Sequence, residues 1–206
     1  MKIFFDTEFT GLHKNTTLIS IGLLDENDRS FYGEFSDYDE CQCDNWIKEN
    51  VLANLKYSNA PYSEPLVNVN ENHTNVYGDK DYIRDKLYEW LSLYDNIELV
   101  SDVCHYDMVL FIDIFGGAFD IPKQVNPVCH DINQDIASHY HISEIEAFDL
   151  SREEIIETHN ELFKEKWPEE IIKIDGDKHN SLYDAKVIKS IYNIINSKII
   201  QMKTLI

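Results

Sequence analysis

Long apolar runs and regularly spaced cysteine pairs are absent from this sequence, and basic residues are few. No stretch approaches the roughly 20 consecutive apolar residues that a membrane-spanning helix requires. After Lys2, only Ile3, Phe4 and Phe5 are apolar before Asp6 interrupts them, which is too short for the core of a signal peptide. We therefore expect a soluble, cytoplasmic protein that does not enter membranes.

The four cysteines do not form the spaced pairs of a zinc site. Cys41 and Cys43 are separated by one residue, and Cys104 and Cys129 stand alone. Structural zinc sites combine cysteine pairs of wider and more regular spacing. We therefore expect free thiols in a reducing compartment.

Positive charge is scarce: 18 Lys and Arg residues face 38 Asp and Glu residues, which gives a net charge of −20. Neutralisation of phosphates usually supplies the affinity of nucleic-acid-binding proteins. Either the partner is not nucleic acid, or the chain collects divalent cations locally and needs only a small basic rim. Bulk charge acts on solubility and long-range steering rather than on the chemistry of a site, so a nuclease that acts on strand ends is not excluded.

The apolar residues that are present are sufficient for a folded core. Of the 206 residues, 43% are hydrophobic and 12% are aromatic. This length and composition predict one globular domain over residues 1–206.

Apolar periodicity predicts an α/β fold. Its sheet is expected to be mixed, with an antiparallel meander at the start of the chain and helices on its faces. Strands are expected over residues 2–6, 16–24, 30–35 and 97–101. Helices are expected over residues 44–55, 79–93, 106–115, 130–140, 151–165 and 182–195, and a long loop over residues 56–75.

The first segment that carries chemistry is Asp6-Thr7-Glu8. Alternate residues of a strand point to the same side, so Asp6 and Glu8 present two carboxylates together. Two like charges this close repel each other unless a cation lies between them, and oxygen ligands suit Mg²⁺ or Mn²⁺. Taken alone, the pair also fits an ordinary acidic strand end at the surface.

The second segment runs from Ser101 to Met108 and follows the strand expected at 97–101. Open α/β sheets bind their ligands at such strand ends. Asp107 is the candidate ligand, although an acid in the first turn of a helix also complements the helix dipole. Asp102 is a rival for the same role.

The third segment is His179-Asn180-Ser181-Leu182-Tyr183-Asp184-Ala185. If the helix begins near Ser181 or Leu182, His179 lies on the preceding loop and can reach a metal site that Asp184 enters from the helix. An exposed loop histidine and a solvated helix acid would have the same pattern.

Together, the three segments resemble the DEDD exonucleases of the ribonuclease H-like superfamily. Asp6 and Glu8 match the family's Asp-x-Glu motif, and Asp107 matches its second motif. The third motif is a helical Asp preceded by a Tyr four residues back or a His five residues back. Here Asn180 and then His179 stand at these positions before Asp184, so the match is to the histidine subtype, DEDDh.

Within that subtype the chain is most similar to the RNase AS-type exoribonucleases. These carry a comparable Asp-Thr-Glu-Phe segment, a Tyr-Asp second motif and a His-x-x-Leu-x-Asp-Ala third motif. The resemblance spans residues 3 to about 195, although residues 56–80 and 120–175 contribute little. Ser181 stands where that family often has Ala, a change between small residues.

The resemblance implies a ribonuclease H-like fold and two divalent metal ions, Mg²⁺ or Mn²⁺, about 3.5–4 Å apart. Asp6 would bridge both ions, Glu8 and Asp184 would hold the ion that binds the attacking water, and Asp107 would act on the other. His179 would be the general base, because its unperturbed pKa of about 6.5 lies close to working pH. The products would be nucleoside monophosphates released from the 3′ end.

Residues next to the first two motifs are candidates for binding the substrate. The resemblance suggests that residues such as Phe9 and Leu12 stack on terminal bases, which tolerates any sequence. Phe9 also fits an ordinary core position. Tyr106 and Trp46 are further stacking candidates, and Thr7 belongs to the expected substrate-binding set.

Other functions stay open on the sequence. A binding module with the same fold that has lost catalysis is one alternative, although all five motif residues are present. An acidic calcium-binding protein is another, since Asp175-Gly176-Asp177 resembles part of a calcium loop, but no Glu stands at the offset that an EF-hand needs. We expect a single-stranded or overhanging substrate with a 3′ end, RNA rather than DNA, and a homodimer as the resemblance implies.

Overall fold

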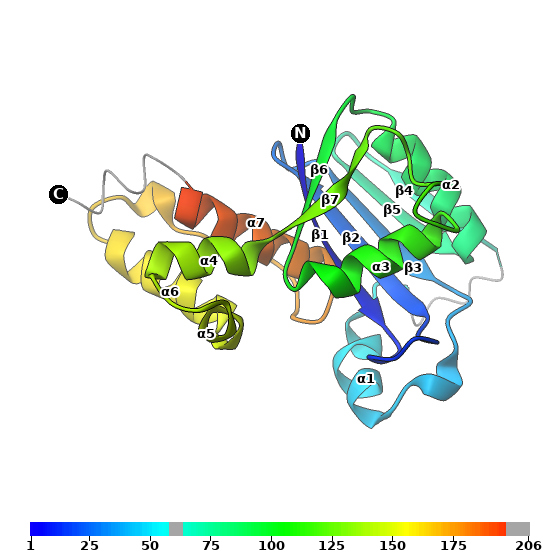
Figure 1. Cartoon of the computed structure of the whole chain (residues 1–206), viewed down its shortest axis with the longest axis horizontal. Coiled ribbons are helices and arrows are strands. Elements are labelled where there is room, and N and C mark those ends of the chain that lie inside the picture. The colour runs from blue at the N-terminus through cyan, green and yellow to red at the C-terminus, as the bar shows by residue number, and fades with distance from the viewer. Residues whose placement is uncertain (58–63, 197–206) are drawn as a thin grey trace.

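In the computed structural model, which describes residues 1–57 and 64–196, seven strands form one mixed sheet in the order β4-β5-β3-β2-β1-β6-β7 (Figure 1). The pairs β1–β2, β2–β3 and β4–β5 are antiparallel, whereas β1–β6, β6–β7 and β3–β5 are parallel. The predicted meander with added parallel strands is therefore confirmed. The bounds are Lys2–Phe9 for β1, Leu18–Asp25 for β2, Ser30–Phe35 for β3, Leu66–Val69 for β4, His73–Gly78 for β5, Ile97–Ser101 for β6 and Val125–Asp131 for β7.

The helices are α1 (Asn45–Asn50), α2 (Lys80–Leu91), α3 (Cys104–Ile114), α4 (Ile132–Tyr140), α5 (Glu144–Asp149), α6 (Arg152–Phe163) and α7 (Ser181–Asn196). Three short 3₁₀ turns occur at Glu40–Gln42, Leu52–Asn54 and Pro168–Glu170. The expected helices at 79–93, 106–115, 130–140, 151–165 and 182–195 correspond to α2, α3, α4, α6 and α7, with ends that differ by up to two residues.

Alternate residues of β1 divide the core between the two faces of the sheet. Ile3 and Phe5 pack with apolar residues of α2 and α3. Phe4 packs on the opposite face with residues of α4, α6 and α7. In Figure 1, α2 and α3 accordingly lie against the sheet, whereas α4, α5 and α6 lie beside α7, on the other side of β1. The same alternation directs Asp6 and Glu8 toward α7, and Thr7 toward α3.

The prediction of a long loop over residues 56–75 was wrong for residues 66–75. β4 and β5 lie there as a hairpin, in which Asn70 Oδ1 accepts hydrogen bonds from the backbone N–H groups of Asn72 and His73. β4 is an edge strand whose Val67 and Val69 are exposed, so no buried face marks it in the sequence. Residues 58–63 of that expected loop lie outside the described residues.

The helix expected over residues 44–55 is divided in two. Asp44 caps α1 as expected, because its carboxylate accepts a hydrogen bond from the backbone N–H of Ile47 at 2.8 Å. After Val51 the chain continues as the 3₁₀ turn Leu52–Asn54 instead. β7 and α5 are two further elements that apolar periodicity did not reveal.

Among residues 1–57 and 64–196, no helix has the length and apolar character to cross a bilayer. All four cysteines are free, as expected.

Candidate active site

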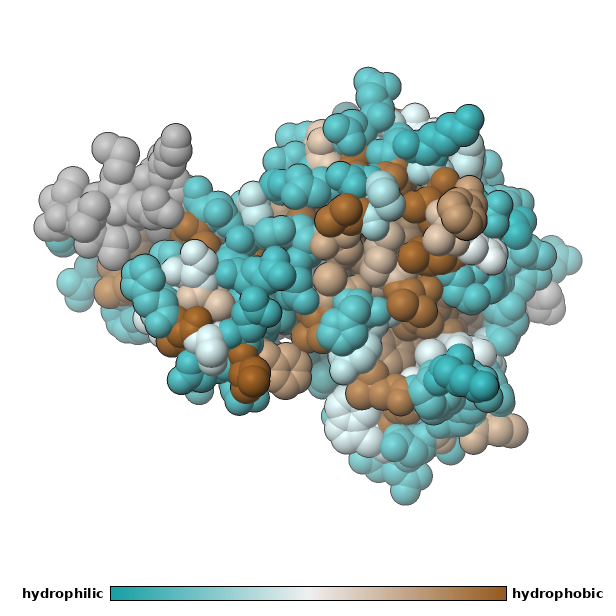
Figure 2. Space-filling model, viewed as in Figure 1, coloured by the Kyte–Doolittle hydropathy of each residue, from teal (hydrophilic) through white to brown (hydrophobic). Residues whose placement is uncertain are grey.

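A cavity of about 700 Å³ opens at the end of β1 that carries Asp6 and Glu8. α1 lines one side and the segment between α5 and α6 lines another, with α3 and the start of α7 completing the wall. Figure 2 shows the surface indented between the part that holds α5 and α6 and the part that holds α1. All ten residues that the sequence singled out for catalysis or substrate binding line this cavity, namely Asp6, Thr7, Glu8, Phe9, Leu12, Trp46, Tyr106, Asp107, His179 and Asp184.

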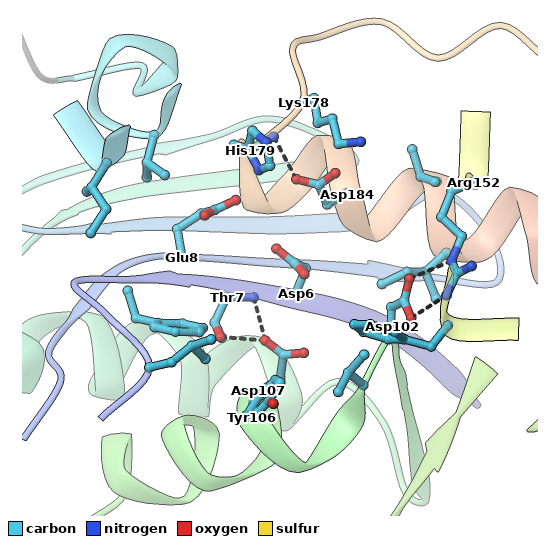
Figure 3. A pocket seen from close by; sticks show the side chains of 18 of the residues that line it. Asp6, Thr7, Glu8, Asp102, Tyr106, Asp107, Arg152, Lys178, His179 and Asp184 are labelled. Atoms are coloured by element: carbon cyan, nitrogen blue, oxygen red, sulfur yellow. Dashed lines mark hydrogen bonds and ion pairs between the residues drawn. The ribbon is translucent and has the colours of Figure 1, made fainter. Parts of the chain in front are cut away.

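Four carboxylates meet at the base of the cavity from three elements. Asp6 and Glu8 come from β1, Asp107 comes from the first turn of α3, and Asp184 comes from the first turn of α7. Figure 3 shows Asp6 between Asp184 and Asp107, with Glu8 near His179. Residues separated by almost the whole chain thus meet because α3 follows β6, the parallel neighbour of β1, and because α7 packs on β1 and β2.

Asp107 is held in place by neighbours on both sides. Its Oδ1 accepts hydrogen bonds from the backbone N–H of Thr7 at 3.0 Å and from the Thr7 hydroxyl at 2.5 Å. Its Oδ2 accepts a hydrogen bond from the hydroxyl of Ser101. The Thr7 side chain is buried, and its two hydrogen bonds orient the Asp107 carboxylate.

His179 lies on the loop before α7, as the sequence predicts. Its φ of +64° is in the left-handed region, which is uncommon for a residue with a side chain. This conformation lets its backbone N–H donate to Asp184 Oδ2 at 2.9 Å. The Trp46 ring packs edge-on against the His179 ring, with centroids 4.9 Å apart.

The side chain of Asn180 also holds the loop before α7 in place. Its side-chain amide donates to the Tyr32 hydroxyl and to the backbone carbonyl of Asn54, both at 3.0 Å. Its side-chain oxygen accepts from the N–H of Leu182 at the start of α7. The residue at the alternative tyrosine position of the third motif therefore fixes the loop.

Burial raises the pKa of every carboxyl group in this cluster, and repulsion from neighbouring acids adds to it. Desolvation is the largest cause for all four, and hydrogen bonds from Ser101 and Thr7 partly offset it at Asp107. The pKa is raised to about 6 for Asp107, to about 7 for Asp184 and to about 8 for Glu8. The pKa of Asp6 is raised well above its ordinary value by desolvation and by the charges of Asp107, Asp184 and Glu8. Four ionised carboxylates are thus unfavourable here without added positive charge.

The side chains fit divalent metal ions. Glu8, His179 and Asp184 each offer a ligand atom, and these atoms lie within 4.8 Å of one another. Asp6 lies next to this group, and its carboxylate is repelled by the charges of the neighbouring acids. Both Asp107 oxygens already accept hydrogen bonds, which favours a contact from Asp107 through water. Carboxylate oxygens are the ligands that Mg²⁺ and Mn²⁺ prefer.

This electrostatic arrangement predicts how stability depends on pH without metal. The carboxyls of Asp107, Asp184 and Glu8 bind protons more tightly in the folded chain than at their ordinary values of 3.8 or 4.5. Between those values and about pH 8, the folded state therefore binds more protons than the unfolded state. The free energy of unfolding falls as the pH rises through this window.

Mg²⁺ or Mn²⁺ should reverse that loss, by about 2.7 kcal/mol at a concentration 100 times the Kd. Thermal unfolding at pH 5 and pH 8, with each divalent ion or with NaCl at matched ionic strength, measures both effects. A melting temperature that responds to NaCl and divalent ions alike would contradict the expectation.

Three expected substrate-binding residues present apolar surface to the cavity. Leu12 is 72% exposed, Tyr106 is half-exposed, and Phe9 is partly buried against the core while still lining the cavity. Trp46, the further candidate, is 52% exposed and lies against His179. The cavity thus offers flat apolar surfaces beside its carboxylates, which suits the stacking of bases.

Asp102, the rival of Asp107 in the sequence, makes contacts that Asp107 does not. The Asp102 carboxylate receives a bidentate contact from the Arg152 guanidinium, at 2.7 Å from Nε and 2.9 Å from Nη2, and a hydrogen bond from the Asn133 amide. Asp102 is therefore engaged with Arg152 and Asn133 at the side of the cavity, whereas Asp107 lies next to Asp6 (Figure 3).

Several residues of the cavity wall were not identified from the sequence. Phe148, Leu150, Arg152, Glu153 and Lys178 all line it. The first four lie in the segment 135–175, where the sequence matched no motif. Lys178 directly precedes His179, and this adjacency is the one signal that could have pointed to it.

Comparison with known proteins gives relatives of one kind. No family model matches the chain. Two curated relatives, both described as 3′-5′ exoribonucleases of Mycobacterium tuberculosis, are 28% identical over 136 residues, which is 65% of this chain and 73% of each relative.

Three solved structures illustrate the similarity of the fold. A 3′-exonuclease in a structure of 3′-end specific recognition of a histone mRNA stem-loop has a TM-score of 0.61 at 13% identity; the alignment covers 97% of this chain and 64% of that one. The Mg²⁺- and Mn²⁺-bound form of Pop2p from S. pombe has a TM-score of 0.56 at 14% identity, with 97% and 84% covered. The nuclease domain of 3′hExo, a DEDDh family member bound to rAMP, has a TM-score of 0.55 at 13% identity, with 97% and 93% covered.

At 13–14% identity these structures show the fold. The chain has the ribonuclease H-like fold of 3′-exonucleases, a mixed sheet flanked by helices, as the sequence predicted. Its similarity in sequence is to proteins described as 3′-5′ exoribonucleases.

Proposed function

We propose that this chain is a divalent-metal-dependent 3′-5′ exonuclease of the DEDDh type that hydrolyses phosphodiester bonds from the 3′ end of single-stranded or overhanging nucleic acid. The observation that carries the proposal is the meeting of four carboxylates with raised pKa values beside His179, inside a cavity on this fold. The RNase AS-type exoribonucleases are the subgroup that we propose, because their third motif matches residues 179–185.

Asp6, Glu8 and Asp184 would hold two divalent ions from β1 and α7, and Asp107 would approach from α3. Bound there, the ions would offset the repulsion among the carboxylates and stabilise negative charge on the phosphate. Thr7 and Ser101 keep Asp107 oriented. In this proposal, the phosphate of the terminal nucleotide lies over Asp6.

His179 would remove the proton from the attacking water with an imidazole nitrogen. Desolvation and the nearby charge of Lys178 lower the pKa of His179, so its ring is neutral and able to accept a proton at neutral pH. The edge-on contact of Trp46 and the left-handed loop fix the direction of the ring.

Replacing His179 with Ala is therefore expected to lower kcat by about 10²–10⁴-fold. The measurement is the initial rate of hydrolysis at saturating Mg²⁺ and substrate. His139→Ala, which removes an exposed histidine of α4, is the control and should retain the wild-type rate. A loss of only a few-fold in His179→Ala would assign the general base to another group.

RNA is the proposed substrate, since the relatives at 28% identity are described as exoribonucleases. The flat apolar side chains of the cavity suit a terminal base of either nucleic acid, so a DNA-directed exonuclease of the same fold is the alternative. A catalytically silent nucleic-acid-binding module is the alternative from another class. A homodimer, which the resemblance implies, belongs to the same proposal.

A substrate panel tests the proposed function. Single-stranded RNA, single-stranded DNA and duplexes with a 3′ overhang are incubated with the purified chain in Mg²⁺, in Mn²⁺ or in chelator. We expect degradation of single-stranded RNA that requires a divalent ion, and slower degradation of DNA. Binding without hydrolysis under every condition would favour the silent binding module, and faster loss of DNA would favour the alternative substrate.

A further inference from the structure

The cavity has little positive charge for a site that is proposed to receive a polyanion. Arg152 and Lys178 are the only Lys or Arg residues among those lining the described cavity. Asp6, Glu8, Asp102, Asp107, Glu153 and Asp184 supply negative charge on its wall. Divalent ions would serve the scissile phosphate, so Arg152 and Lys178 are the lining side chains whose charge could neutralise a further phosphate of the strand.

Arg152 has no donor left for a phosphate. A guanidinium group has five N–H donors, and the protein accepts all five. Two go to the Asp102 carboxylate, one goes to the Asn133 side-chain oxygen, and two go to the backbone carbonyls of Ala147 and Leu150, at distances of 2.6–2.9 Å. Arg152 therefore joins the segment between α5 and α6 to the end of β6.

Lys178 is bound far less completely. Its ammonium group pairs with Glu153 Oε1 at 2.8 Å, and its side chain is 56% exposed. An ammonium group has three donors, so this pair leaves capacity for another acceptor. The backbone of Lys178 is fixed, because its carbonyl accepts a hydrogen bond from the Asn54 amide at 2.7 Å. Lys178 thus has a held backbone and a side chain that can exchange partners.

The position of Lys178 suits a phosphate next to the reacting one. It directly precedes His179, and Figure 3 shows its side chain beside His179 and Asp184, with the amino group directed along the cavity toward the side that holds Arg152. An exposed ion pair such as Lys178–Glu153 contributes little to stability. A phosphate group can therefore replace the Glu153 carboxylate at low cost.

We propose that Lys178 binds a backbone phosphate of the nucleic-acid strand, and that Glu153 occupies Lys178 until the strand displaces it. This inference rests on the proposed function and adds a specificity-determining cation to that site. Glu153 then competes with other anions for Lys178. An anion that lacks the further contacts of a strand therefore binds weakly.

A purely structural role for the same ion pair makes a different prediction. If Lys178–Glu153 only ties α6 to the loop before α7, removing either partner has the same consequence. If Lys178 binds phosphate and Glu153 competes for it, removing the two partners has opposite consequences for affinity. The sign of the change caused by Glu153→Gln therefore separates the two roles.

The test compares Lys178→Ala, Lys178→Arg and Glu153→Gln with the wild-type chain. The probe is a short fluorescein-labelled single-stranded RNA with phosphorothioate linkages, and its Kd is measured by anisotropy in Mg²⁺ over a series of NaCl concentrations. Hydrolysis of the unmodified RNA gives kcat and KM for each variant. Lys164→Ala and Glu161→Gln are matched controls, because Lys164 and Glu161 form an exposed ion pair of the same residue types at the far end of α6.

We expect Lys178→Ala to raise the Kd and KM by about tenfold, with a smaller change in kcat. Its slope of log affinity against log salt should be shallower by about 0.7, the value for one phosphate on a single strand. Lys178→Arg should retain most of the affinity, Glu153→Gln should lower the Kd several-fold, and the control pair should change it less than twofold.

Equal weakening by Lys178→Ala and Glu153→Gln would overturn the inference in favour of a structural tie. An unchanged Kd and salt slope in Lys178→Ala, with a wild-type chain that hydrolyses RNA, would refute the role of Lys178 alone. A wild-type chain that neither binds nor hydrolyses RNA would refute the proposed function and the inference together.

Discussion

An Asp6→Asn variant is expected to lose hydrolysis by about 10³-fold or more while its fold is retained. Asp6 is the central carboxylate of the cluster and lies between Asp107 and Asp184 (Figure 3). Metal contacts in such sites are worth several kcal/mol of transition-state stabilisation, and each 1.36 kcal/mol corresponds to about tenfold in rate. The amide keeps the shape of the side chain but removes its charge.

The same variant should be at least as stable as the wild-type chain in chelator. Burial and four neighbouring acids raise the pKa of Asp6, so the ionised carboxylate is unfavourable in the folded state without metal. Thermal unfolding in chelator and in Mg²⁺ measures this, and the metal-induced rise in melting temperature should be smaller in Asp6→Asn. Wild-type activity that still requires metal, in a folded Asp6→Asn variant, would refute the assigned site.

Replacing Gly22 with Ala is expected to impair both the fold and the site. Gly22 pairs with Asp6 across β1 and β2, and the start of α7 lies directly on it. A Cβ atom at Gly22 would lie 2.3 Å from the backbone N of Leu182 and 2.4 Å from the carbonyl carbon of Ser181. Such contacts with backbone cannot be relieved by a side-chain rotation, so α7 would have to move away from the sheet.

The displacement would carry His179 and Asp184 with it. We expect a loss of about 1–3 kcal/mol in the free energy of unfolding, as for other overpacked cores, and a loss of about 10²-fold in kcat, since an error of about 1 Å in position has that effect. Gly33→Ala is the control, because a Cβ there meets only side-chain atoms at 3.1–3.4 Å. Equal kcat values for the two variants would show that the α7 contact does not position the site.

The hydrogen bond between the hydroxyls of Ser20 and Ser181 belongs to the same contact. The two oxygen atoms are 2.9 Å apart, and both side chains are fully buried. Ser181 stands where the resembling family often has Ala. In this chain its hydroxyl has a partner on β2, so the change from Ala carries no unpaired polar group into the core.

The carboxylates and His179 could be found from the sequence because each lies in a short segment with its own local signal. Alternation along β1 places Asp6 and Glu8 on one side, and a helix start places Asp107 and Asp184 in first turns. These rules act over a few residues. The loop geometry that turns His179 toward Asp184 depends on Asn180, whose partners Tyr32 and Asn54 are distant in the sequence.

The far wall of the cavity could not be found in this way. Arg152, Glu153 and Phe148 reach the cavity because α5 and α6 fold back beside α7, and no periodicity within residues 135–175 encodes that return. Three strands, β4, β5 and β7, were also missed. β4 and β7 are edge strands, and an edge strand owes its existence to its neighbour more than to its own apolar pattern. β5 lies inside the sheet, but Val76 is its one apolar residue in the core.

The structure also shows where part of the negative charge behind the net charge of −20 lies. Several acidic side chains line the cavity, where they suit cations, whereas the Arg152 guanidinium donates its hydrogen bonds within the protein. An acidic chain can therefore act on a polyanion if metal ions and one exchangeable lysine supply the local positive charge.

Metal-dependent removal of single nucleotides from a 3′ end can be followed on end-labelled RNA. Single-stranded RNA labelled at the 5′ end is incubated with the chain in Mg²⁺, alongside the same RNA with a blocked 3′ end and alongside the Asp6→Asn variant. We expect a ladder that shortens one nucleotide at a time, release of nucleoside monophosphates, and no reaction with the blocked RNA, the variant or chelator. Internal cleavage of the blocked RNA, or an undiminished ladder in chelator, would contradict it.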